Sequence, residues 1–211
     1  MGPGPRRTKR WERRRAEILA VAEEVFGERG FAGVPLEEVA DRIDMQRPSL
    51  LYYFPDKEAL YDATFAGILD ALLDRIERTR EEPGPLERME AIATTWIDFV
   101  SERPHAARIL LRQMVDELPT RSIDTNARVA AMLMSIQEAI GDGVLQGLFK
   151  PLDAAKYAVT LAGASLVWVA ARHVVRRSLG FDPLGGEHLE DYRAMLVRLT
   201  RQVLEAPCPD E

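Results

Sequence analysis

Four polar side chains flank Leu50 at positions that are not needed to form a hydrophobic core: Gln46, Arg47, Ser49 and Tyr52. An arginine can donate two parallel hydrogen bonds to a guanine edge, and a glutamine can both donate to and accept from adenine. Because such contacts require an element that fits the major groove of DNA, the chemistry of this segment is that of direct base readout.

Two short helices must position these side chains. Apolar residues recur at helical spacing ahead of them and the pattern breaks at Asp44: Leu36, Val39, Ala40 and Ile43. A second helix follows, in which Pro48 is tolerated as an early helical residue. The pattern predicts a helix-turn-helix over about residues 35–54, with the second helix in a major groove. Tyr53 and Lys57 follow on its flank, where they suit phosphate oxygens.

Positive charge is concentrated at the N-terminal end of the chain. The net charge is −6, yet residues 1–15 carry seven basic residues against Glu12 alone. Residues 1–60 balance 11 basic and 11 acidic residues, and the remaining 151 residues carry 17 basic and 23 acidic ones. Basic side chains bind the phosphate backbone of any sequence. We therefore expect a flexible basic arm over residues 1–10, in which Arg6 and Arg7 contact DNA.

Two longer helices flank the helix-turn-helix. The first is expected over about residues 11–29, with Gly30 as a left-handed stop. Asp56 is expected to cap a second helix that continues to about residue 80 and spans roughly 35 Å, enough to bridge two regions. The segment EEPGP, residues 81–85, then ends this helix and is the clearest boundary in the chain.

The order of these segments resembles a known family. A first amphipathic helix, ERGFAG, LEEVADRIDMQRPSLLYYF and then PDKEAL are similar to the N-terminal domain of tetracycline-repressor-type (TetR) transcriptional regulators, over about residues 11–72. The resemblance implies a homodimeric repressor of double-stranded DNA operators, with a C-terminal domain that binds a small-molecule effector. It places Tyr53 and Lys57 on phosphates and residues 46–52, Pro48 included, on the recognition helix.

Three residues depart from the family pattern. Leu51 stands where a phosphate-contacting tyrosine is usual, which leaves Tyr52 or Tyr53 to make that contact. Pro48 stands where glycine or alanine is commoner. Asp44 replaces the glycine of the turn, and an aspartate can adopt the left-handed conformation at modest cost.

Helical periodicity continues to the C-terminal end, so the chain is expected to be all-α with about nine helices. Three segments are predicted: the arm 1–10, a DNA-binding domain 11–72, and a domain for effector binding and dimerisation, 81–211. One helix, expected over about residues 154–178, contains an almost wholly apolar stretch of fifteen residues. That stretch is shorter than the ~20 residues of a membrane span, which favours a buried helix and no membrane contact.

The last helix, expected over about residues 187–205, carries a narrow apolar seam with steps of 3, 4, 3 and 4: Leu189, Tyr192, Leu196, Leu199 and Val203. Paired with a face of small residues that includes Ala162, this seam predicts a four-helix interface between two copies in a C2 dimer. The alternative is a helix that packs only within its own subunit.

An effector cavity is predicted among apolar residues with a few polar ones: Trp96, Phe99, Ile109, Gln113, Met114, Met132, Ile136, Ser165 and Trp168. Several methionines indicate an adaptable interior and hence an apolar ligand. The expected function is a repressor that such a small, largely apolar effector releases from a palindromic operator.

Other classes are less well supported by the residues. The sequence has no H-E-x-x-H, G-x-S-x-G or phosphate-loop motif, and neither His105 nor His173 has a second ligand at metal-binding spacing, so we expect neither an enzyme nor a metal or cofactor. The single cysteine, Cys208, and the absence of an apolar leader favour a cytoplasmic location. A helical protein-interaction adaptor that binds no DNA remains the alternative.

Overall fold

The computed structural model describes residues 9–116 and 123–205, and within these ranges the chain is helical between its turns. The elements are α1 (Lys9–Arg29), α2 (Leu36–Arg42), α3 (Arg47–Tyr53), α4 (Lys57–Arg78), η1 (Thr79–Glu81), α5 (Pro85–Glu102), α6 (Pro104–Val115), α7 (Ile123–Leu145), α8 (Ala154–Ala170), α9 (Arg172–Leu179) and α10 (Gly186–Leu204). The expected all-α fold is confirmed.

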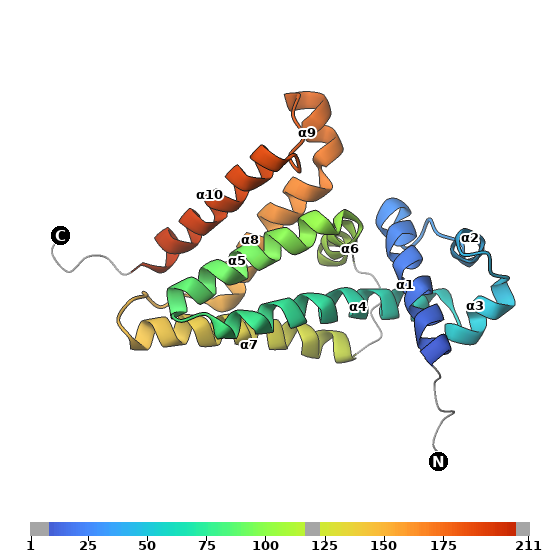
Figure 1. Ribbon diagram of the computed structural model, residues 1–211, viewed down its shortest axis with the longest axis horizontal. Coiled ribbons are helices and arrows are strands. Elements are labelled where there is room, and N and C mark those ends of the chain that lie inside the picture. The colour runs from blue at the N-terminus through green and yellow to red at the C-terminus, as the bar shows by residue number, and fades with distance from the viewer. Residues whose placement is uncertain (1–8, 117–122, 206–211) are drawn as a thin grey trace, which may run out of the picture.

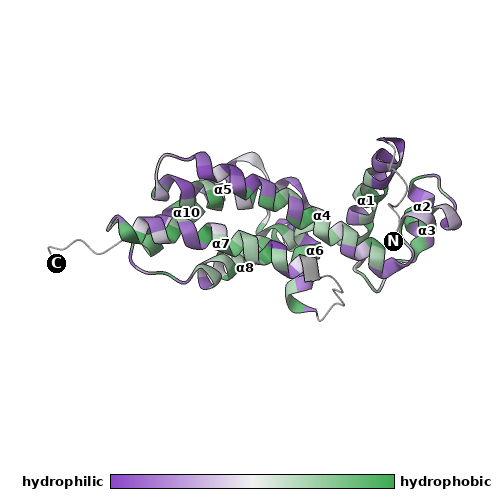
Figure 2. Ribbon diagram, turned by 90° about the horizontal axis from the view of Figure 1, so that it is seen from below, coloured by the Kyte–Doolittle hydropathy of each residue, from purple (hydrophilic) through white to green (hydrophobic). Residues whose placement is uncertain are grey.

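The molecule has a small head and a larger helical body, joined by α4. Helices α1, α2 and α3 form the head at one end, and α4 runs from it along the length of the body (Figure 1). Within the body, α4 packs against α5 and α7, whereas α10 packs against α5. Hydrophobic colouring runs through the helices of the body in Figure 2, and the buried core includes residues of α4, α5, α7 and α8.

Local sequence signals account for the positions where these helices start and stop. Gly30 has a φ of +74° and ends α1, and Asp44 has a φ of +49° in the turn between α2 and α3. The Asp56 side chain accepts a hydrogen bond of 2.7 Å from the backbone N–H of Ala59 and so caps α4. All three predictions are confirmed.

One predicted helix is wrong. The apolar segment expected to run unbroken over residues 154–178 bends by 64° between α8 and α9. Ala171, at the break, has φ −82° and ψ 9°, outside the α-helical region. The extra break gives ten α-helices in the described residues instead of about nine. No single described helix is long and apolar enough to cross a membrane; only this bent pair meets that test.

The predicted boundary at residues 81–85 coincides with the turn between η1 and α5. However, the C-terminal half of α4 belongs to the core of the body: Ile68, Leu72 and Ile76 are buried. Helix α1 also packs on α6, so head and body share a second contact besides α4 itself. The exact domain limits of 11–72 and 81–211 stay a prediction.

Candidate nucleic-acid interface and effector cavity

Helix α3 presents its polar side chains to solvent. Leu50 is completely buried and fixes α3 on the head, whereas Tyr52 is 74% exposed. The other predicted base-reading residues are also exposed: Gln46, Arg47, Pro48 and Ser49. The left-handed turn at Asp44 lies three residues before α3, and the burial of Leu50 holds the helix on the head with these side chains at the surface. The arrangement fits a helix that enters a DNA groove.

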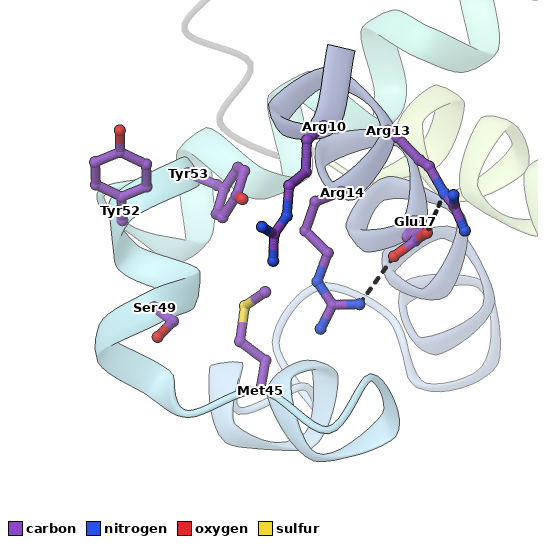
Figure 3. Close-up of a pocket in the computed structure, with 8 residues that line it drawn as sticks. All are labelled: Arg10, Arg13, Arg14, Glu17, Met45, Ser49, Tyr52 and Tyr53. Atoms are coloured by element: carbon purple, nitrogen blue, oxygen red, sulfur yellow. Dashed lines mark hydrogen bonds and ion pairs between the residues drawn. The ribbon is translucent and has the colours of Figure 1, made fainter. Parts of the chain in front are cut away.

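A basic hollow of about 510 Å³ lies between α1 and α3. Arginines 10, 13 and 14 line it from α1, and Ser49, Tyr52 and Tyr53 line it from α3 (Figure 3). Glu17 pairs with two of these arginines, and its pKa is lowered mainly by the hydrogen bond from Arg14. The sequence reasoning counted these arginines only as charge, although their i, i+3 and i+4 spacing already placed them on one helix face.

Three predicted DNA contacts have partners within the head. Arg47 forms an ion pair with Glu37 at 2.9 Å. The Lys57 ammonium donates to the Ala32 carbonyl at 3.3 Å and lies 4.6 Å from the centroid of the Phe31 ring. The Tyr53 ring stacks on Trp11, with centroids 5.5 Å apart. Contact with DNA must therefore compete with these interactions or use the remaining donors of each side chain.

The predicted arm contacts Arg6 and Arg7 lie outside the described residues. The described part of the chain begins at Lys9, which is the first residue of α1.

A second cavity, of about 330 Å³, lies in the body and has an almost wholly apolar wall. Helices α4, α5, α6, α7 and α8 all contribute to it. Five of the predicted effector residues line it: Trp96, Gln113, Met114, Met132 and Ile136. The effector residues expected from the sequence include none of those that α4 contributes: Phe65, Leu69, Leu72 and Ile76.

Four predicted effector residues do not line this cavity. Phe99 is completely buried, with the Arg75 and Arg103 guanidinium carbons 5.2 and 4.9 Å from its ring centroid. Ile109 is core as well. The other two side chains interact outside the cavity. The Ser165 hydroxyl donates a hydrogen bond of 2.8 Å to the Leu161 carbonyl, and the Trp168 ring stacks on the Tyr192 ring of α10, with centroids 4.7 Å apart.

Two polar groups in the cavity wall are distinctive. The Gln113 carbonyl oxygen accepts a hydrogen bond of 3.2 Å from the Tyr61 hydroxyl. Burial raises the pKa of Tyr61 to about 12, so this hydroxyl keeps its proton at neutral pH. The Trp96 indole nitrogen is buried and has no hydrogen-bond partner among the described residues. An unsatisfied buried donor costs about 1–3 kcal/mol.

The predicted dimer seam on α10 divides into two faces. Tyr192 and Leu196 are 8% and 3% exposed because α10 packs against α5, so these two side chains are not available to a partner. Ala162 lines the cavity instead of a free face, and Leu189 is half-buried. Leu199 and Val203 of the seam remain exposed, as does Met195 on the same helix. Val159 and Val167 are exposed on α8.

Helix α6 joins the cavity to the head. It carries Gln113 and Met114 in the cavity wall, and its Arg112 donates to the carbonyls of Phe26 at 2.8 Å and Gly27 at 3.1 Å. These are carbonyls at the C-terminal end of α1, where a cation is favourable. The two helices approach closely: a Cβ on Gly27 would lie 2.7 Å from the α6 backbone. Sequence reasoning did not find this contact.

Comparison with known proteins matches both halves of the chain. Residues 18–64 match the family model described as bacterial regulatory proteins, tetR family. Residues 85–199 match the model of the tetracyclin repressor-like C-terminal domain. The first model spans the C-terminal part of α1, all of α2 and α3, and the first part of α4, and the second spans the body from α5 into α10.

Individual relatives agree with this assignment. The HTH-type transcriptional regulator RutR of Escherichia coli K12 is 25% identical over 186 residues, which are 88% of this chain and 85% of RutR. The HTH-type transcriptional repressor KstR2 of Mycobacterium tuberculosis H37Rv is 26% identical over 144 residues, 65% of this chain and 70% of KstR2. A tetR-family regulatory protein from Rhodococcus RHA1 has the same fold, with a TM-score of 0.74 at 18% identity, covering 92% of this chain and 98% of its own. The chain belongs to the tetR family of bacterial regulatory proteins.

Proposed function

We propose that the chain is a ligand-responsive transcriptional repressor. The observation that carries the proposal is the connection of two sites through α6: its residues line an apolar cavity, and its Arg112 holds the end of α1 in the DNA-binding head. A small, largely apolar effector that displaces α6 would therefore move the head. Repression is chosen because KstR2, one of the relatives, is named a repressor.

DNA recognition rests on α3 and the basic hollow. Arg47 and Gln46 contact base edges, and the arginines of α1 together with Lys57 contact phosphates. Arg6 and Arg7 extend these contacts along the backbone as part of the arm. Salt should weaken binding strongly, because every neutralised phosphate releases counterions.

The active form is a homodimer that binds a pseudo-palindromic operator. Apolar side chains on α8 and α10 remain exposed in one chain and are suited to a C2 interface: Val167, Met195, Leu199 and Val203. Two recognition helices related by this symmetry should read half-sites roughly 34–36 Å apart, or a multiple of that distance.

The curated relatives are transcriptional regulators. We accordingly assign the chain no catalytic role and no cofactor, and we place it in the cytoplasm, where its DNA is. A protein-interaction adaptor with the same helices would bind no DNA even at low salt.

Selection from a random DNA library with the full-length protein tests the proposal. We expect an enriched palindrome and a complex of two chains per site. Enrichment of a single asymmetric half-site by a monomer, or no enrichment at 50 mM salt, would refute the proposed DNA recognition, and the second result would favour an adaptor.

A further inference from the structure

Among the described residues, the wall of the effector cavity offers hydrogen-bond donors and no charged side chain. Among its described lining residues, Gln113 and Trp96 carry the only side-chain polar atoms apart from methionine sulfur, and none is ionisable. A charged ligand group would lose its hydration in this wall without gaining an opposite charge. The wall therefore selects for neutral molecules.

Both polar groups are available as donors. The Tyr61 hydroxyl donates to the Gln113 carbonyl oxygen, which fixes the amide so that its nitrogen is left to donate elsewhere. The Trp96 indole N–H can only donate, and within the described residues it has no acceptor. A ligand that places an oxygen against either group would remove the cost of leaving a donor unpaired.

The volume indicates how much of a ligand the cavity encloses, since its wall includes exposed side chains such as Met114 and Val159. The cavity measures about 330 Å³. At roughly 30 Å³ for each water-sized group, it holds about eleven non-hydrogen atoms. That is the size of a ten-carbon chain with one oxygen atom.

We propose that the effector is a neutral, mainly aliphatic molecule of about eleven non-hydrogen atoms with one accepting oxygen, a ketone or an alcohol, held by the Gln113 amide. The inference rests on the proposed function and specifies the ligand class of the same cavity. It also places the polar end of the ligand beside the head, since Tyr61 makes edge contacts with Phe26 and Phe31, with ring centroids 5.1 Å apart in each pair. A ligand oxygen at Gln113 is thus one hydrogen bond away from residues that pack α1.

The test measures binding of undecane, 2-decanone, 1-decanol and decanoate to the full-length protein at pH 7, by titration calorimetry and tryptophan fluorescence. In Gln113→Leu, the preference for 2-decanone relative to undecane should fall about tenfold, while undecane affinity is kept. Gln137→Leu, at an exposed position of α7, is the matched control and should change neither affinity. Tyr61→Phe removes the hydrogen bond that orients the Gln113 amide, so it should also lower the preference for 2-decanone over undecane.

Decanoate should bind the unchanged protein at least ~100-fold more weakly than 1-decanol, because its charge has no partner in the wall. Equal or tighter binding of decanoate, no binding of 2-decanone and 1-decanol, or a ketone preference that survives Gln113→Leu would each overturn the ligand class. Operator release measured on the same samples separates the two proposals. Ligand binding that depends on Gln113 but never releases DNA contradicts the repressor function alone, whereas release without that dependence contradicts the ligand class alone.

Discussion

Removing the Arg112 guanidinium should uncouple the effector cavity from the DNA-binding head. In Arg112→Met the apolar stem is retained, but the hydrogen bonds to the carbonyls of Phe26 and Gly27, at 2.8 and 3.1 Å, are lost. Hydrogen bonds from charged groups contribute about 1.5–3 kcal/mol each when buried. Because Arg112 is partly exposed, we take about 2 kcal/mol for the pair.

This energy sets the expected loss of response. If the effector weakens operator binding 100-fold, within the usual range for such coupling, about 2.7 kcal/mol links the two sites. Losing about 2 kcal/mol of it leaves a response of about threefold. Operator affinity without effector should change little, since α3 keeps its own packing on the head.

Fluorescence anisotropy of labelled operator, with and without a saturating cavity ligand, measures this response. Arg201→Met is the matched control, because Arg201 pairs with Glu90 between α10 and α5, away from the joint of α1 and α6. A response that stays 100-fold in Arg112→Met would refute transmission through α6. An equal loss in both variants would point to general destabilisation instead.

Three further outcomes are expected. Arg47→Ala should weaken operator binding by ~1–3 kcal/mol and relax the preference at one base pair, while Lys57→Ala should weaken binding to all DNA alike and reduce the salt dependence of binding by about one unit. Titrations on operator and random DNA distinguish the two variants. Equal losses of affinity on both DNAs would remove Arg47 from base readout. Leu199→Glu should dissociate the dimer and leave the fold intact. Leu196→Glu should instead lower the melting temperature, because the Leu196 side chain is only 3% exposed. Light scattering that shows an intact dimer for Leu199→Glu would place the interface elsewhere. Gly27→Ala should lower the free energy of unfolding by about 1–3 kcal/mol in denaturant titrations because the added carbon meets the α6 backbone, and an unchanged midpoint would mean that the two helices separate freely.

Features that depend on a few neighbouring residues could be predicted from the sequence. The stop at Gly30, the turn at Asp44 and the cap at Asp56 are each decided by backbone geometry or one short hydrogen bond. The exposed face of α3 followed from the same short-range reasoning, since Leu50 is the only residue of that helix that is fully buried. The helix-turn-helix could therefore be placed without knowledge of the rest of the fold.

Features that depend on how helices distant in the sequence pack together could not be predicted from the sequence. Trp96 and Phe99 share the inward side of α5, yet only Trp96 borders the cavity, because the void is created by the positions of four other helices. In α10, the same 3, 4 spacing fits packing within a subunit or across a dimer, and Leu196 is buried by its own chain.

Two other misses have the same physical origin. Arg112 has the sequence signature of a solvated charge, because nothing near it in the sequence indicates that the end of α1 lies opposite. The break at Ala171 carries neither proline nor glycine as a signal. Arg172, the next residue, pairs with Asp182, whose pKa falls to about 2 mainly through that hydrogen bond, and this contact forms only once the chain has turned.

The reciprocal effect of operator and effector on each other tests the central claim most directly. The affinity of the dimer for 2-decanone should be measured by calorimetry with and without saturating operator DNA. Linkage requires operator DNA to weaken ligand binding by the same factor by which the ligand weakens operator binding, and we expect about 100-fold for both. A ligand affinity that is identical with and without operator would contradict the account, because the cavity and the reading head would then be independent.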